Sequence, residues 1–156
     1  MKVGILYYSK TGHTLDAAKA IAEGIKKSGT NQVDLINANS VEIAILKIYD
    51  GIIFGSPCWG GCITNNGVAT PITKALNKLA ENSLKDKIAG VYTIYAIKGG
   101  EKTNNTLIKL IKEKGCKKIM EGPIIKAGAV LSIGKGSSIS EQDIQLLKHF
   151  GQTFVK

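Results

Sequence analysis

A hydroxyl-rich loop near the start of the chain has the residue types needed to bind a phosphate. Residues 8–14 read Tyr-Ser-Lys-Thr-Gly-His-Thr and lie between an apolar run and an amphipathic one. If these runs form a strand and a helix, the first-turn N–H groups and the helix dipole favour an anion. Hydroxyls add donors, glycine allows close backbone approach, and lysine and histidine add positive charge. We predict a phosphate site at Ser9, Lys10, Thr11, Gly12, His13 and Thr14.

The same loop also has an ordinary interpretation, in which a threonine only caps the helix. The loop contains neither G-x-x-x-x-G-K-[ST] nor G-x-G-x-x-G, the patterns typical of nucleoside-triphosphate and dinucleotide sites. A monophosphate is the ligand that its hydroxyls suit.

Two further loops follow apolar runs and carry residues suited to a flat aromatic ligand. Run 50–55 leads into Ser56, Pro57, Cys58, Trp59, Gly60 and Gly61, and run 88–95 leads through Thr93, Ile94 and Tyr95 to Gly99 and Gly100. The single tryptophan could stack on a ring, which contributes about 0.5 to 1.5 kcal/mol beyond its buried area. The alternative is that the indole only covers an edge of the sheet.

Apolar strands alternate with amphipathic helices along the whole chain. The strands are predicted at 3–7, 32–36, 50–55, 88–95 and, in two pieces broken at Gly122-Pro123, at 118–121 and 124–127. A short helix is predicted at 41–48 and a longer one at 15–25. Three more helices are predicted from their N-caps: one capped by Thr70 with Pro71 as its first residue, one capped by Thr103 or Asn104, and one capped by Ser140. This order predicts one α/β domain, 1–156, with a doubly wound five-stranded parallel sheet and helices on both faces. In such a sheet, loops that follow strands converge at one edge.

The formal charge of +9 is carried by lysines alone and is unevenly spread. Residues 74–126 hold twelve lysines against five acids. Because base readout and phosphate forks favour arginine, we do not expect a nucleic-acid partner. A solvated lysine face and a docking face for an acidic partner both remain open.

Cysteine usage and hydropathy indicate a cytoplasmic protein. Three cysteines without metal-ligand spacing, Cys58, Cys62 and Cys116, suit free thiols in a reducing compartment. No apolar run approaches the roughly 20 residues of a membrane span, and no signal-peptide core is present. We expect no membrane association, no metal site and a monomer or weak dimer.

Together the loops resemble those of the flavodoxin family, specifically its short-chain type. Residues 8–14 are similar to the family pattern [ST]-x-T-G-x-T, and the spacing to the segment 55–60 is also similar. The resemblance implies the strand order 2-1-3-4-5 and flavin mononucleotide (FMN) as cofactor. It assigns the phosphate to the first loop, the flavin ring to residues 56–61, and the second face of the ring to the third loop, with Tyr95 as the candidate.

The function that this resemblance implies is electron transfer through the semiquinone/hydroquinone couple of FMN. A redox partner protein would then exchange electrons with the flavin. We hypothesise that the Gly60 carbonyl stabilises the neutral semiquinone, because glycine permits a flip of the Gly60-Gly61 peptide. Positive charge at Lys10 and Lys98 would favour the anionic hydroquinone and make the low potential less negative than is usual in the family.

Two other functions remain open at this point. One is an FMN-dependent NAD(P)H:quinone or nitro reductase on the same fold, although only short loops are available for a nicotinamide site. The other is a binding module that has lost the flavin, since the third loop lacks the acidic residue usual in the family. An electron carrier is the preferred interpretation over an enzyme that acts alone.

Overall fold

The five predicted strands form one parallel sheet with helices on both faces. The computed structural model describes residues 1–58, 67–128 and 136–156. The strands are β1 (Lys2–Tyr7), β2 (Gln32–Asn37), β3 (Gly51–Pro57), β4 (Ile88–Tyr95) and β5 (Lys118–Lys126). The helices are α1 (His13–Lys27), the 3-10 helix η1 (Ile43–Ile48), α2 (Thr70–Lys78), α3 (Gly100–Lys112) and α4 (Glu141–Phe154). The sheet order β2-β1-β3-β4-β5 confirms the predicted doubly wound fold.

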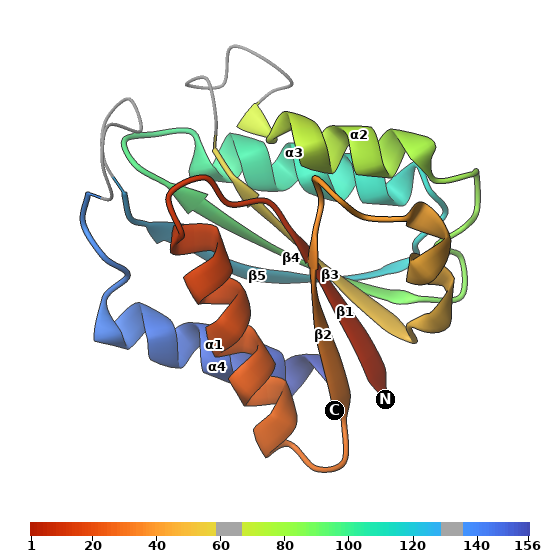
Figure 1. Cartoon of the computed structure of the whole chain (residues 1–156), viewed down its shortest axis with the longest axis horizontal. Coiled ribbons are helices and arrows are strands. Elements are labelled where there is room, and N and C mark those ends of the chain that lie inside the picture. The colour runs from red at the N-terminus through yellow and green to blue at the C-terminus, as the bar shows by residue number, and fades with distance from the viewer. Residues whose placement is uncertain (59–66, 129–135) are drawn as a thin grey trace.

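Each face of the sheet is covered by its own helical layer. Figure 1 shows α1 and α4 on one face and α2 and α3 on the other. The apolar core is divided accordingly, with Ile5, Ile21 and Phe150 in the α1/α4 half and Leu6, Phe54 and Leu107 in the α2/α3 half. The central strand β3 is buried on both faces, which explains its unbroken apolar sequence.

Two helix starts differ from the prediction. Thr70 is the first residue of α2, and Ala69 stands at the N-cap without a side-chain hydrogen bond. Helix α3 begins at Gly100 after Gly99, whose φ of 93° lies in the left-handed region, so the chain turns at a glycine. Thr103 and Asn104 do not cap this helix, because both lie within it, and both are buried. The Ser140 cap is confirmed, since its Oγ accepts a hydrogen bond from the Asp143 N–H at 3.1 Å.

The predicted break in the last strand is also wrong. β5 runs without interruption from Lys118 to Lys126. Its pairing with β4 shifts register between Val91 and Thr93, opposite the Gly122-Pro123 pair. Because the bulge interrupts the regular ladder at this point, the strand can accommodate a proline, which has no N–H to donate.

Within the described part of the chain, no helix has the length and apolar character needed to cross a membrane.

Candidate functional site

The three loops singled out in the sequence leave the sheet side by side. The Tyr8 N–H donates to the Gly55 carbonyl at 3.3 Å, and the Cys58 N–H donates to the Ile94 carbonyl at 2.7 Å. The Ala127 N–H donates to the Tyr95 carbonyl at 2.9 Å. Each bond continues the ladder between neighbouring strands by one residue, so the loops after β1, β3, β4 and β5 begin at the same edge.

The first loop is shaped around the start of α1. The Gly12 N–H donates to Ser9 Oγ at 3.1 Å, and Gly12 has a φ of 100° that favours glycine. No side chain caps this helix at Gly12, and the Asp16 N–H closes its first turn on the Gly12 carbonyl at 2.9 Å. The N-terminus of a 15-residue helix is therefore available to an anion at this loop. His13 and Thr14 are buried here, with exposures of 3% and 2%.

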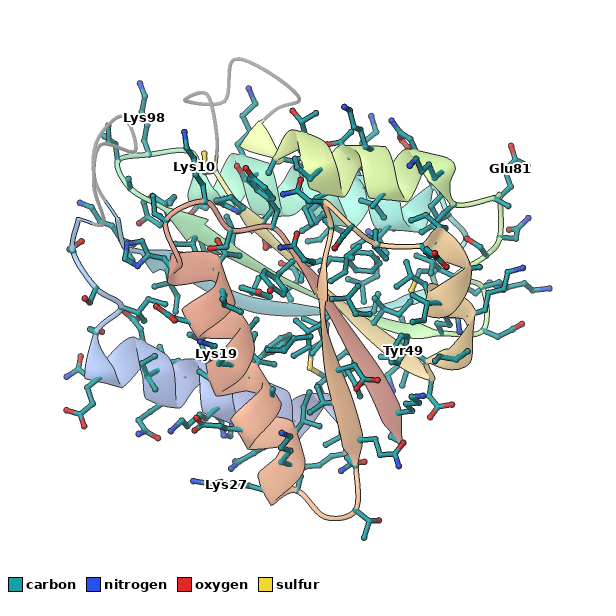
Figure 2. All side chains as sticks on the ribbon, viewed as in Figure 1. Lys10, Lys19, Lys27, Tyr49, Glu81 and Lys98 are labelled. Atoms are coloured by element: carbon teal, nitrogen blue, oxygen red, sulfur yellow. The ribbon has the colours of Figure 1, made fainter. Side chains whose placement is uncertain are left out.

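A cavity of about 50 Å³ opens between these loops. Its lining comes from the first loop, the ends of β3 and β4, and the segments that follow β4 and β5: Lys10, Thr11, His13, Thr14, Pro57, Cys58, Ile94, Tyr95, Ala96, Ala127 and Gly128. This volume suits a phosphate-sized group and is smaller than the about 300 to 1,000 Å³ of a typical whole-ligand pocket. Figure 2 shows Lys10 and Lys98 at this end of the molecule.

Several predicted site residues shape the loops and do not line the cavity. Ser56 Oγ accepts from the Ala69 N–H at 2.9 Å and donates to the Pro57 carbonyl at 2.9 Å. Thr93 Oγ1 bonds to Asn104 Oδ1 at 3.4 Å, beneath α3. Ser56 therefore fixes the start of α2, and Thr93 belongs to the contact between β4 and α3.

The glycines of the third loop make room for an aromatic ring. A Cβ atom at Gly100 would lie 2.6 Å from Tyr95 Cδ1 and 2.6 Å from Ile124 Cγ2. Gly100 thus lets the Tyr95 ring lie against the first turn of α3. Tyr95 lines the cavity, whereas Gly99 and Gly100 do not.

The predicted ring contacts Trp59, Gly60 and Gly61 lie outside the described residues, as does the hypothesised peptide flip. Cys58 is the last described residue of that loop. Its Sγ lies 3.5 Å from the Lys98 carbonyl, which joins the second loop to the third.

Sequence reasoning missed Tyr92, which ties β4 to the first turn of α1. Its hydroxyl donates to the Thr14 carbonyl at 3.0 Å, and the whole side chain is buried. A Cβ atom at Gly55 would lie 2.2 Å from the Tyr92 hydroxyl oxygen, so the glycine admits the ring. Burial raises the pKa of Tyr92 well above its ordinary value, and Tyr7 adds to the effect, so the hydroxyl stays a donor. The sequence did offer one signal, a tyrosine in an otherwise apolar strand. A tyrosine hydroxyl that is buried needs a hydrogen-bond partner.

Ala96 and the segment after β5 were also missed, because small residues carry no chemical signal. Ala96, Ala127 and Gly128 complete the cavity wall. Gly128 has a φ of 102°, and a Cβ atom there would lie 3.3 Å from His13 Cδ2. The small residue lets the chain pass close to the imidazole.

Residues 5–142 match the family model described as flavodoxin. A flavodoxin from Clostridium saccharobutylicum is 36% identical over 101 residues, which cover 64% of this chain and 60% of that protein. An NAD(P)H dehydrogenase (quinone) from Caulobacter vibrioides is 32% identical over 131 residues, 70% of this chain and 64% of the relative. A putative diflavin flavoprotein A 4 from Synechocystis is matched over only 16% of its length. The matches thus span less than two thirds of these relatives.

Solved structures agree on the fold. A Streptococcus flavodoxin superimposes with a TM-score of 0.80 at 20% identity, covering 99% of this chain and 98% of the other. A short-chain flavodoxin associated with a bacterial microcompartment gives a TM-score of 0.77 at 15% identity, covering 99% and 97%.

Proposed function

This chain belongs to the flavodoxin family, and from that premise we propose that it binds FMN and carries electrons between partner proteins. The observation that carries the proposal is the first loop. It joins an uncapped helix N-terminus, three hydroxyl residues and a lysine at the edge where the loops converge. The flavodoxin from Clostridium saccharobutylicum, which is matched over part of its length, supports the same function.

The residues present suit the phosphate end of FMN. Main-chain N–H groups at the start of α1 and the hydroxyls of Thr11 and Thr14 supply donors to a dianion. Lys10 supplies positive charge, and Ser9 holds the turn through its bond to the Gly12 N–H. A cavity of about 50 Å³ lined by Lys10, Thr11, His13 and Thr14 accommodates a group of this size.

The remaining residues act by position. Tyr92 ties β4 to the first turn of α1, so the helix N-terminus is held at a fixed place above the sheet. Tyr95 offers an aromatic face in the cavity wall beside Pro57 and Cys58. When bound, the flavin would supply the redox chemistry, while the chain supplies binding and orientation.

A comparison of FMN with riboflavin tests this proposal. Both share the ring, so only FMN can use the first loop. We expect fluorescence titration to give FMN an affinity at least about a hundredfold higher, because hydrogen bonds to charged groups contribute about 1.5 to 3 kcal/mol each. Thr11→Ala should weaken FMN binding by roughly tenfold or more and leave riboflavin binding unchanged. Equal affinities for the two flavins, or no uptake of either, would contradict the proposal.

A second candidate is an NAD(P)H:quinone reductase. Its support is the partial match to the Caulobacter dehydrogenase, over 70% of this chain. Steady oxidation of NADPH by the FMN-loaded chain and a quinone, without an added reductase, would favour this candidate.

A reducing compartment such as the cytoplasm fits the chemistry of the buried thiol of Cys116. This thiol is free, and burial raises the pKa of Cys116. That thiol is therefore held in its unreactive protonated form.

A further inference from the structure

The two helical layers carry very different net charge. Helices α1 and α4 hold four lysines and four acids: Lys19, Lys26, Lys27 and Lys148 with Asp16, Glu23, Glu141 and Asp143. Helix α2 and the segment 98–112 hold six lysines and a single acid, Glu101. We call these six exposed lysines the lysine face: Lys74, Lys78, Lys98, Lys102, Lys109 and Lys112.

Two ion pairs balance charge on the layer formed by α1 and α4, which we call the neutral layer. Lys148 Nζ lies 2.8 Å from Glu23 Oε2, and Lys19 Nζ lies 3.9 Å from Asp16 Oδ1. Within the same two segments the lysine face has six bases to one acid, a net charge of +5. Like charges gathered in this way repel and oppose folding.

Helix dipoles account for only part of the lysine face. Lys78, Lys109 and Lys112 lie in the last turns of α2 and α3, where positive charge is favourable. Lys98 and Lys102 flank the opposite end of α3, where the dipole is positive and lysine is unfavourable. The first turn of α3 also holds one acid, Glu101, whereas the first turns on the neutral layer hold acids without lysines, Asp16 in α1 and Glu141 and Asp143 in α4.

The unfavourable lysines lie beside the candidate site. The Lys98 carbonyl is 3.5 Å from Cys58 Sγ, and Cys58 lines the cavity. Lys102 is in the first turn of α3, immediately after the third loop. Lys74 lies about one turn into α2, which also begins at this edge. Figure 1 shows α2 and α3 over the same face of the sheet, and their inner side chains share one apolar core.

We propose that the lysine face, centred on Lys74, Lys98 and Lys102, is the docking surface for an acidic electron-transfer protein. The proposal rests on the proposed function and names its partner class. A nucleic acid fits less well, because the face contains no arginine. A partner seated here lies at the edge where the three loops meet, and positive charge there raises the rate of encounter with an acidic surface.

The first test measures binding and does not depend on flavin. The isotope-labelled chain is titrated with an acidic [2Fe–2S] ferredoxin as the probe, and amide shifts are followed by NMR. We expect shifts to gather in 70–78 and 96–109, and the affinity to fall about tenfold or more as ionic strength rises from about 0.01 to 0.15 M, where the Debye length shrinks from about 30 to 8 Å.

Charge reversal locates the surface. Lys74→Glu with Lys102→Glu should weaken ferredoxin binding about tenfold at low ionic strength. The matched control is Lys26→Glu with Lys27→Glu, which makes the same change in net charge on exposed residues at the far end of α1. Equal weakening by both pairs would overturn the proposal, because net charge alone would then explain the binding. Tighter binding of a short DNA duplex than of ferredoxin would also overturn it, in favour of a nucleic acid.

The FMN titration separates this proposal from the function on which it rests. Ferredoxin binding at 70–78 and 96–109 without FMN uptake would support the docking surface and contradict the electron carrier. FMN uptake with no selective effect of Lys74→Glu and Lys102→Glu would support the carrier and contradict the docking surface.

Discussion

Helices α1 and α4 meet through their backbones, whereas α2 and α3 cover the other face of the sheet with large side chains and a lysine-rich exterior. A Cβ atom at Gly24 of α1 would lie 2.0 Å from the Lys148 carbonyl oxygen, and one at Gly151 of α4 would lie 2.2 Å from the Ile21 carbonyl oxygen. The charges of the neutral layer thus balance, and the contact between its two helices leaves no room for a side chain at Gly24 or Gly151. Both layers bury polar groups, His13 and Thr14 in α1 and Thr103 and Asn104 in α3, but the unbalanced charge lies on the α2/α3 layer.

This difference between the two layers separates the features that stability of the fold explains from those that it does not. Close backbone packing and ion pairs in the α1/α4 layer serve stability. In the α2/α3 layer, the features that folding leaves unexplained lie at the end of α3 that adjoins the loops. The stability contacts of α1 with α4 and the proposed docking surface therefore lie on opposite faces of one sheet, whereas the candidate cavity lies at the edge between them. The predictions below test that division.

The largest expected effect is at the glycine contact of the neutral layer. Gly24→Ala should destabilise the protein by about 3 kcal/mol, because the new methyl group would push α1 from α4. In an ordinary helix this substitution stabilises by up to about 1 kcal/mol, so the sign of the change is itself informative. Asn105→Ala, at an exposed position of α3, is the control and should leave stability unchanged or slightly higher. Urea denaturation measures both, and a neutral Gly24→Ala would remove the contrast between the layers.

The tyrosine beneath the phosphate loop should give the next largest effect. Tyr92→Phe keeps the buried ring but leaves the Thr14 carbonyl without its donor, at a cost of about 1 to 3 kcal/mol. FMN binding should weaken with it, because the start of α1 is then held less firmly. Tyr49→Phe is the matched control, since the Tyr49 hydroxyl bonds to Asp34 Oδ2 at 3.0 Å, away from the cavity. Equal losses of FMN affinity in the two variants would argue against a positioning role for Tyr92.

A buried hydroxyl under α3 should respond in the opposite direction. Among the described residues, Thr103 Oγ1 is buried with no hydrogen-bond partner. Thr103→Val replaces it with a methyl group of similar shape and should stabilise the protein by about 1 kcal/mol. Thermal unfolding would reveal the gain. A loss of 1 kcal/mol or more would mean that the hydroxyl contributes to stability in its present place.

The smallest predicted effect is the pH dependence of the ion pair between α1 and α4. The hydrogen bond to Lys148 lowers the pKa of Glu23 below its ordinary value. A lowered pKa in the folded state stabilises the protein above the unfolded pKa, and this contribution is lost as pH falls through the folded value. Since the Glu23 side chain is 57% exposed, Glu23→Gln should cost less than about 1 kcal/mol at pH 7.

At acid pH the difference between Glu23→Gln and the parent should vanish. Denaturation curves at neutral pH and at a pH below the Glu23 pKa provide the test. A constant difference at both would mean that the carboxylate charge is not responsible.

The sequence predicted the alternation of strands and helices and the loops that converge, because apolar periodicity and strand-to-loop order are local signals. It could not predict the contacts between distant segments. Gly24 and Gly151 look like helix-weakening residues until the other helix is in place. The glycine at position 55 makes sense only once the Tyr92 ring is known to lie against it. Thr103 resembled a cap because a hydroxyl residue before an apolar run is the usual sign of one.

The most direct test of the central claim is the visible absorption spectrum of the purified chain after FMN loading and removal of unbound flavin, recorded again after NADPH is added. The account predicts flavin bands that remain with the protein and stay oxidised with NADPH until a reductase protein is supplied. A spectrum without flavin would contradict the FMN site at the converging loops. Bleaching by NADPH alone would contradict the carrier and favour the reductase.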